Sequence, residues 1–237
     1  MKGQVIPEKH LIELMIFFSE HRLMEPKIIW ENEKKFKEYI NAQTFKFVNS
    51  GTSALYLIMN HLKNTGATTV WGPAFTHISW INCANWLELT HDFVDISEKT
   101  LSLDPNKLRE KIKNEGPPDI VVMVDMAGYV GEDTLEVKKI CEEYDITMVE
   151  DAAHAFGQKY AGKLSGTFGD YGFYSFSTPK LLTVGEGGGL VCANKDEIDI
   201  FDQSIYQGGW YKNFKTHYTK GLNFIMSNWL TELLWYQ

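Results

Sequence analysis

The chain has 237 residues, of which 44% are hydrophobic and 14% aromatic, so it can bury a substantial core and is not a disordered protein. It carries 23 Lys and Arg against 31 Asp and Glu, a net charge of -8, and no basic cluster, which excludes nucleic acid as a partner. Its cysteines, Cys83, Cys141 and Cys192, are widely spaced and follow no metal-binding pattern, which excludes a disulfide framework and a zinc site.

The first predicted elements are two helices. Apolar residues at helical spacing predict them over residues 11–20 and 30–40, with a break at Pro26. The apolar run 11–18 is too short to span a membrane and contains Glu13, and no signal-peptide pattern precedes it. We therefore expect a cytoplasmic protein with no membrane partner.

From residue 45 onward, short apolar runs alternate with helical patterns. Strands are predicted at residues 45–48, 68–71, 91–96, 119–125 and 146–151, and helices after Thr52, up to Ala84, near Leu108 and over residues 133–144. This alternation predicts an α/β fold whose mostly parallel sheet has helices on both faces. Such sheets bind ligands at the carboxyl ends of their strands, beside helix N-termini.

The pattern changes after residue 149. Runs 166–176 and 187–194 predict short strands around a functional loop, and Asn194 is placed to cap a helix that starts near residue 195. Residues 221–237 predict a turn and a helix whose apolar side chains have nothing to cover them. We therefore expect the chain to stop within a larger structure.

The first candidate for chemistry is VNSGTSAL, residues 48–55, which has the form of a strand end, a small-residue turn and a helix start. At such a helix start, Gly51, Thr52 and Ser53 would direct backbone N–H groups, two hydroxyls and the positive end of the helix dipole toward an anion such as a phosphate. The alternative is that these residues simply cap the helix.

The second candidate is VEDAAHAFG, residues 149–157, where an apolar strand ends on an acid. Asp151 is suited to pair with a protonated pyridine nitrogen, which keeps pyridoxal phosphate an electron sink. Alternatively Asp151 caps a helix, or Asp151 and His154 bind a metal, although no further ligands recur nearby. His154 would hydrogen-bond near the phenolic oxygen of the cofactor or serve the structure alone.

The third candidate is Lys180, in FGDYGFYSFSTPKLLTVGEGGGL, residues 168–190. Taken alone it reads as a surface lysine. With the helix start and Asp151, it predicts a pyridoxal phosphate site in which Lys180 forms the Schiff base and later moves a proton between carbons. Ser175 would add a hydroxyl to the phosphate, and the glycines at 185 and 187–189 allow close backbone approach.

Six motifs occur together along the chain: SGTSAL, PAFTH, EDAAHAFG, GTFGDYGFYSF followed by Lys180, GEGG and GLNFIMS. From about residue 23 to the C-terminus, their order resembles the DegT/DnrJ/StrS family of pyridoxal-phosphate-dependent nucleotide-sugar aminotransferases. The resemblance implies the large domain of a fold type I transferase and a homodimer with active sites at the subunit interface. It also implies glutamate as amino donor and a keto sugar linked to a nucleoside diphosphate as acceptor.

The resemblance implies cofactor-binding roles for Gly51, Thr52, Ser53, His77, Asp151, His154, Ser175, Lys180 and Asn223, and a catalytic role for Lys180. Thr52, Ser53 and Ser175 match phosphate ligands. His77 stands where the family has an aromatic ring stacked on the cofactor, and an imidazole can stack there with less area. Asn223 matches an Asn that reaches the phosphate of the neighbouring subunit.

The sequence departs from the family pattern in three places. Ile225 stands where an Arg is common, and residues 126–128 replace a histidine-containing stretch. Members usually continue through a second, smaller domain. We therefore expect residues 1–220 to form the pyridoxal-phosphate-binding large domain with its N-terminal helical segment, and residues 221–237 to begin a truncated C-terminal region.

The predicted function is transfer of an amino group from glutamate to a keto sugar, for amino-sugar, polysaccharide or secondary-metabolite synthesis. A branch of the family has His at the position of Lys180 and dehydrates sugars, so Lys180 favours transamination. Two alternatives are a pyridoxal-phosphate-dependent sugar dehydratase and a regulatory protein that binds the cofactor or a sugar without turnover.

Overall fold

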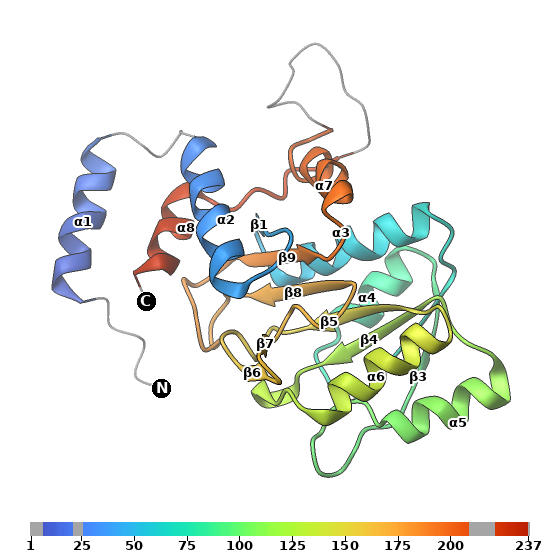
Figure 1. Ribbon diagram of the computed structural model, residues 1–237. Coiled ribbons are helices and arrows are strands. Elements are labelled where there is room, and N and C mark those ends of the chain that lie inside the picture. Colours follow the sequence, from blue (N-terminus) through green and yellow to red (C-terminus); the bar gives the residue numbers. More distant parts are fainter. Residues whose placement is uncertain (1–6, 21–25, 209–220, 237) are drawn as a thin grey trace.

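The centre of the fold is one mixed sheet (Figure 1). The computed structural model describes residues 7–20, 26–208 and 221–236, and within them seven strands pair in the order β1-β9-β8-β5-β4-β2-β3. The strands are β1 Lys46–Val48, β2 Thr69–Gly72, β3 Thr90–Phe93, β4 Ile120–Val124, β5 Thr147–Asp151, β8 Tyr171–Ser175 and β9 Gly188–Cys192. All pairs from β8 to β3 are parallel, whereas β9 is antiparallel to β8 and β1.

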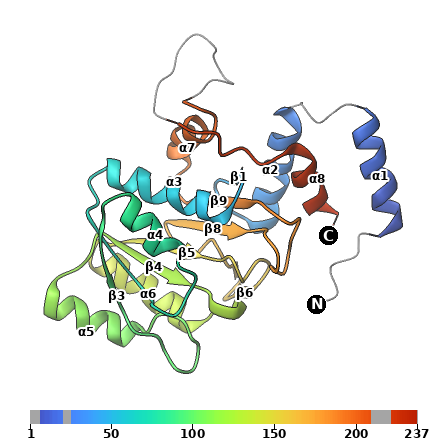
Figure 2. The same ribbon diagram turned by 180° about the vertical axis from the view of Figure 1, so that it is seen from behind.

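Helices cover both faces of this sheet, as predicted. They are α1 Glu8–Ser19, α2 Pro26–Ile40, α3 Gly51–Asn64, α4 Ser79–Trp86, α5 Pro105–Glu115, α6 Glu132–Glu143, α7 Ile198–Ile205 and α8 Asn228–Trp235. The short 3-10 turns are η2 Met126–Gly128 and η3 Lys195–Glu197, and β6 Lys159–Tyr160 pairs with β7 Lys163–Leu164. Helices α5 and α6 lie in front in Figure 1, and α3 and α4 in the reverse view of Figure 2. The prediction of a mostly parallel α/β sheet is confirmed.

Side chains alternate between the two faces of the central strands. Val122 and Val124 pack with α3 and α4, whereas Val121 and Met123 pack with α5 and α6. Because both faces are covered, β4 is a continuous run of buried apolar residues. The strand predicted at 91–96 was too long, because β3 ends at Phe93 and Ile96 forms only an isolated bridge to Leu103.

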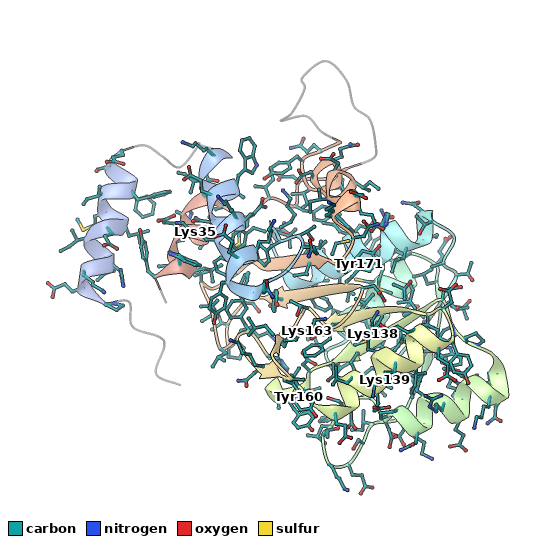
Figure 3. All side chains as sticks on the ribbon, in the orientation of Figure 1. Lys35, Lys138, Lys139, Tyr160, Lys163 and Tyr171 are labelled. Carbon is teal, nitrogen blue, oxygen red and sulfur yellow. The ribbon has the colours of Figure 1, made fainter. Side chains whose placement is uncertain are left out.

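The last helix is covered, contrary to the prediction. Leu230 and Leu234 of α8 are buried in one aromatic-rich cluster with Phe36 of α2. Lys35 of α2 lies over the ring of Trp235, 5.5 Å from its centroid (Figure 3). The sequence could not show this cover, because the covering helix lies about 200 residues earlier in the chain.

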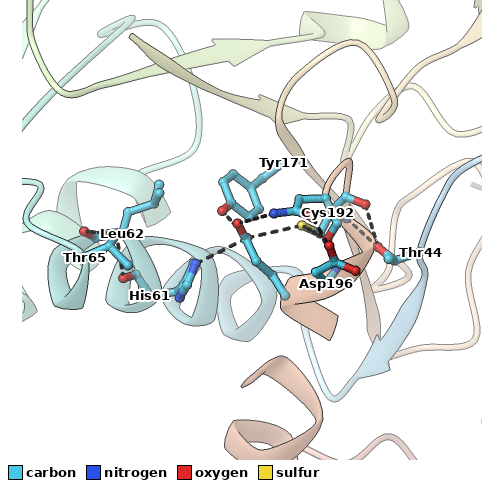
Figure 4. A network of polar contacts seen from close by, with 9 residues as sticks. Thr44, His61, Leu62, Thr65, Tyr171, Cys192 and Asp196 are labelled. Carbon is cyan, nitrogen blue, oxygen red and sulfur yellow. Dashed lines mark hydrogen bonds and ion pairs between the residues drawn. The ribbon is translucent and has the colours of Figure 1, made fainter. Parts of the chain in front are cut away.

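Polar contacts hold the sheet to the elements that follow it. Asn194 caps η3 as predicted, by accepting a hydrogen bond from the backbone N–H of Asp196 at 3.1 Å. Glu197 accepts from the Tyr171 hydroxyl at 2.5 Å and lies 3.3 Å from Nε2 of His61, the network of Figure 4. These contacts join the end of α3 to η3.

A buried ion-pair cluster ties α2 to β1 and α7. Nζ of Lys46 lies 3.0 Å from Oε2 of Glu33 and 2.6 Å from Oδ1 of Asp202. The backbone N–H of Phe47 donates to the same Glu33 carboxylate at 3.1 Å. This cluster holds the edge strand between two helices that are far apart in sequence.

Two further sequence expectations concern thiols and domain limits. All three cysteines are free and buried. The predicted boundary between residues 220 and 221 adjoins segment 209–220, which lies outside the described residues. No helix in the described part of the chain has the length and apolarity needed to cross a membrane.

Candidate active site

A cleft of about 290 Å³ opens at the carboxyl ends of β4, β5 and β8, beside the N-terminus of α3. Its lining consists of Ser50, Gly51, Thr52, Thr76, His77, Ser79, Val124, Asp125, Asp151, Ala153, His154, Phe173, Ser175, Ser177 and Lys180. The sheet and one helix thus bring together seven of the nine residues predicted for the site. The two not brought to this lining are Ser53 and Asn223.

The N-terminus of α3 forms one wall of the cleft. Ser50 caps the helix by accepting a hydrogen bond from the backbone N–H of Ser53 at 3.0 Å. A Cβ on Gly51 would lie 2.9 Å from Cβ of Ser175, so a glycine lets the helix begin against β8. The capping alternative is therefore correct for Ser50, and it leaves the first N–H groups of the helix facing the cleft.

Asp151 stands at the end of β5 on the cleft side of the sheet. It is paired in register with Val124, which packs toward α3, and the residue is 7% exposed. Its Oδ1 accepts a hydrogen bond from the backbone N–H of Ala153 at 3.0 Å. Burial raises the pKa of Asp151 to about 6, partly offset by this hydrogen bond and by the charge of Lys180. Asp151 is therefore ionised at neutral pH.

Lys180 lies in the loop after β8, half-buried at the cleft wall. Its backbone N–H donates to the carbonyl of Ser177 at 2.9 Å, which fixes the turn that presents the side chain. Burial lowers the pKa of the Lys180 amine, and the charge of Asp151 opposes that shift. A larger share of Lys180 is thus an uncharged, nucleophilic amine than in an exposed lysine.

Two histidines stand at the mouth of the cleft. Nδ1 of His77 accepts a hydrogen bond from the backbone N–H of Ser79 at 3.3 Å, which orients the ring. The pKa of His154 is lowered by desolvation at the cleft wall and by the nearby Lys180 and His77. His154 is therefore neutral near pH 7 and can donate or accept a hydrogen bond.

The Ser53 hydroxyl and the Asn223 amide have other contacts. The Ser53 hydroxyl pairs with that of Ser50 at 2.8 Å. Asn223 is exposed, forms an isolated bridge with Tyr206 and accepts from the backbone N–H of Ile225 at 3.4 Å. The role of Asn223 toward a neighbouring subunit stays a prediction.

Several lining residues were not singled out from the sequence. They are Thr76, Ser79, Ser177 and Asp125, together with the apolar Val124, Ala153 and Phe173. Asp125 had the same signal as Asp151, an acid directly after a buried strand. The other polar residues had none, because isolated Ser and Thr are common in loops.

The cleft fits pyridoxal phosphate. The start of α3 offers N–H groups for a phosphate, Val124 and Ala153 offer apolar contact for a ring, and Asp151 offers a buried carboxylate for its nitrogen. Lys180 on the same lining offers the amine. Within the described ranges, no group of three or more His, Cys, Asp or Glu side chains is arranged to hold a metal ion.

Comparison with known proteins gives a consistent result. The model of the DegT/DnrJ/EryC1/StrS aminotransferase family matches residues 20–237. The GDP-perosamine synthase of Escherichia coli O157:H7 is 31% identical over 199 residues, which are 83% of this chain and 53% of that protein. A UDP-4-amino-4,6-dideoxy-N-acetyl-beta-L-altrosamine transaminase of Campylobacter jejuni is 31% identical over 82% of this chain and 51% of its own length. The chain thus spans about half the length of these relatives.

Solved structures share the fold. An aminotransferase from Psychrobacter cryohalolentis superposes with a TM-score of 0.87 at 20% identity, over 99% of this chain and 62% of that chain. A Helicobacter pylori aminotransferase involved in the biosynthesis of pseudoaminic acid superposes with a TM-score of 0.86 at 22% identity, over 98% and 62%. The predicted fold type I large domain is therefore confirmed.

Proposed function

Because the chain belongs to the DegT/DnrJ/EryC1/StrS aminotransferase family, whose cofactor is pyridoxal phosphate, we propose that it is the catalytic part of a sugar aminotransferase. The amino donor is glutamate, and the acceptor is a keto sugar linked to a nucleoside diphosphate. Relatives named for GDP- and UDP-linked sugars support this acceptor class.

One observation carries the proposal. Lys180 and Asp151 line the same cleft as the start of α3, and each charge affects the pKa of the other group. A protein that only bound a phosphate would need neither a half-buried lysine nor a buried acid opposite it. The three features together fit transamination.

The residues have distinct tasks. When bound, pyridoxal phosphate supplies the electron sink for a carbanion at the substrate carbon. The backbone N–H groups of Gly51 and Thr52 and the hydroxyl of Ser175 would bind the phosphate. The carboxylate of Asp151 would stabilise a proton on the ring nitrogen, and the imidazole of His77 would stack on the ring.

Lys180 is the catalytic base. Its lowered pKa leaves the amine free to accept a proton from the α-carbon of glutamate and, in the second half-reaction, to return a proton to the sugar carbon. Glutamate enters and leaves as 2-oxoglutarate before the keto sugar enters. Ping-pong kinetics are therefore expected, and a ternary complex would contradict this order.

The proposed enzyme is a homodimer in which each active site uses residues of both copies of the chain. Asn223 is exposed and outside its own cleft, a position consistent with reaching the phosphate of a partner in a homodimer. Mixing inactive Lys180→Ala and Asn223→Ala proteins should then restore part of the activity, because some mixed sites contain both residues intact. No restoration after subunit exchange would contradict a shared site.

The absorbance spectrum tests the function directly. Pyridoxal phosphate is added to the purified protein, to Lys180→Ala and to Lys113→Ala, which changes an exposed lysine of α5 as a control. Wild type and control should both show a cofactor–lysine band that bleaches when glutamate is added. Lys180→Ala should show none.

The other outcomes separate the alternatives. A band that glutamate does not change would favour a cofactor-binding protein without turnover. A deoxy sugar in place of an amino sugar would favour a dehydratase. Equal bands in Lys180→Ala and wild type would contradict the assignment of Lys180.

A further inference from the structure

Three acids lie close together where β4 and β5 end: Asp125 directly after β4, and Glu150 and Asp151 at the end of β5. In the register of the two strands Met123 is paired with Glu150 and Val124 with Asp151. Because side chains alternate along a strand, Asp125 and Glu150 share the sheet face opposite to that of Asp151. Asp125 and Glu150 are both fully buried, and Asp125 also contributes to the floor of the cleft.

The hydrogen-bond donors around these two buried acids are unequally divided. Glu150 accepts three backbone N–H groups, from Gly166 at 2.5 Å, Phe168 at 2.6 Å and Gly169 at 3.1 Å. A carboxylate with three such donors is stabilised in its ionised form. Burial raises the pKa of Glu150, and the three donors oppose that shift, whereas among the residues described no such donor opposes it at Asp125. Glu150 is therefore the member of the pair that holds the negative charge.

Asp125 has the opposite surroundings. Among the described residues neither of its carboxylate oxygens has a hydrogen-bond donor. The titratable groups that interact with it electrostatically are Glu150 and Asp151 from β5 and Tyr174 from β8, all of them acids. The hydroxyl of Tyr174 donates to the carbonyl of Ser165. An ionised Asp125 would thus be buried with neither a donor nor a cation, which is costly.

We propose that Asp125 is a positioning residue that keeps its proton at neutral pH and donates it in a hydrogen bond to Glu150. Burial and the charge of Glu150 raise the pKa of Asp125 well above its usual range, which agrees with this placement of the proton. The pair then carries one negative charge.

The proton has a consequence for the cleft. Two ionised carboxylates behind Asp151 would favour its protonated form, whereas one leaves its pKa at about 6. Asp125 thereby keeps Asp151 ionised at neutral pH, in the state that can hold a protonated ring nitrogen. Only this consequence rests on the proposed function; the shared proton does not.

Infrared spectroscopy of the cofactor-free protein tests the proton. Carbon-13 labelling of the aspartate carboxyls distinguishes their C=O stretch from that of protonated glutamates, and Asp125→Asn provides the difference spectrum at about pH 7.5. Wild type should show one protonated aspartate band, and Asp125→Asn should lack it. Identical spectra would overturn the proposal.

Two further measurements test the position of Asp125. The titration midpoint of Asp151 should be the same in wild type and in Asp125→Asn, because both lack a charge at residue 125. A lower midpoint in Asp125→Asn would mean that wild-type Asp125 is ionised. Asp125→Leu, which cannot donate to Glu150, should melt at a lower temperature than Asp125→Asn, and equal melting would contradict the hydrogen bond.

The outcomes stay separable. If Asp125→Asn does not fold, the infrared spectrum of the labelled wild type tests the shared proton by itself. Its protonated aspartate band should persist as the pH rises through 7, and loss of the band would overturn the proposal. A persistent band in a protein that binds no pyridoxal phosphate would refute the proposed function and leave the shared proton standing.

Discussion

Two clusters of buried acids in the described part of the chain differ in what surrounds them. In the first, Lys46 contacts both Glu33 and Asp202 within 3.0 Å. In the second, Asp125 and Asp151 contact no cation directly within the described structure, and Lys180 acts on Asp151 only through its charge. Both clusters lie beside the same sheet, and both contain acids with a raised pKa.

This difference indicates that the first cluster stabilises the fold, whereas the second can bind a ligand. A cation in direct contact with two acids fixes α2, β1 and α7 to one another, and the ion pairs already balance its charge. Buried acids without such a cation, such as Asp125 and Asp151, lower the stability of the fold when they are ionised, and a proton or a cationic ligand relieves that cost. We therefore expect changes in the first cluster to affect folding, and changes in the second to affect binding.

Removing the cation of the first cluster should have the largest effect on stability. Lys46→Met leaves Glu33 and Asp202 without the ion pairs that they make in the wild type. Loss of one partner from a buried pair costs about 3–5 kcal/mol, and the free energy of unfolding in urea at pH 7.5 should fall by that order.

An exposed ion pair provides the matched control. Lys27 and Glu31 lie 3.4 Å apart on α2 with both side chains more than half exposed. Lys27→Met should therefore change the free energy of unfolding by less than about 0.5 kcal/mol. Similar losses in the two variants would remove the distinction between the clusters.

The pH dependence of stability should show an intermediate effect. Burial raises the pKa of Glu33 from 4.5 to about 7, in spite of Lys46. Between these values the folded state keeps a proton that the unfolded state has lost, so the contribution of Glu33 is complete below about pH 4.5 and declines as the pH rises toward 7. The expected decline is about 1–3 kcal/mol.

Glu33→Gln isolates this decline. Its amide oxygen can still accept the Phe47 N–H but has no proton to lose. All other acids titrate in both proteins, so the difference between the two curves of unfolding free energy against pH reports Glu33 alone. Parallel curves from pH 4 to 8 would show that folding does not raise the pKa of Glu33.

The sequence predicted the features that depend on local patterns, namely the strands and the residues at their ends. The strands around Val122 and Val149 were predicted because each is a short, continuous apolar run between helical patterns. Lys180 and Asp151 were predicted to meet because both follow strands, and the carboxyl ends of neighbouring parallel strands share one edge. The observed sheet order and cleft lining agree.

What the sequence could not predict depends on distant partners. Lys46 meets Asp202, 156 positions later, so nothing near either residue reveals the pair. The Ser53 hydroxyl forms a hydrogen bond with the Ser50 hydroxyl. This contact depends on the side-chain rotamer of Ser53, which the sequence motif does not determine. The proton assigned to Asp125 depends on three N–H donors that the chain gives to Glu150 from residues 166–169.

The smallest effect should come from the second cluster, where a substitution stabilises the cofactor-free protein, the opposite of the effect of Lys46→Met. Burial raises the pKa of Asp151 from 3.8 to about 6, so its ionised form lowers the free energy of unfolding as the pH rises through this window. Asp151→Asn keeps the acceptor for the Ala153 N–H and removes the charge. Without cofactor, it should be more stable than wild type by about 1 kcal/mol at pH 8 and unchanged near pH 4.

The control for this last change is Asp95→Asn, an exposed acid that likewise accepts a backbone N–H, that of Ile96 at 2.9 Å. It should alter neither stability nor binding. Asp151→Asn should weaken the binding of pyridoxal phosphate, because the ring nitrogen loses its ionic partner. If Asp151→Asn is less stable than wild type at pH 8 and still binds the cofactor, Asp151 stabilises the fold, as Glu33 and Lys46 do, and does not bind the ring nitrogen.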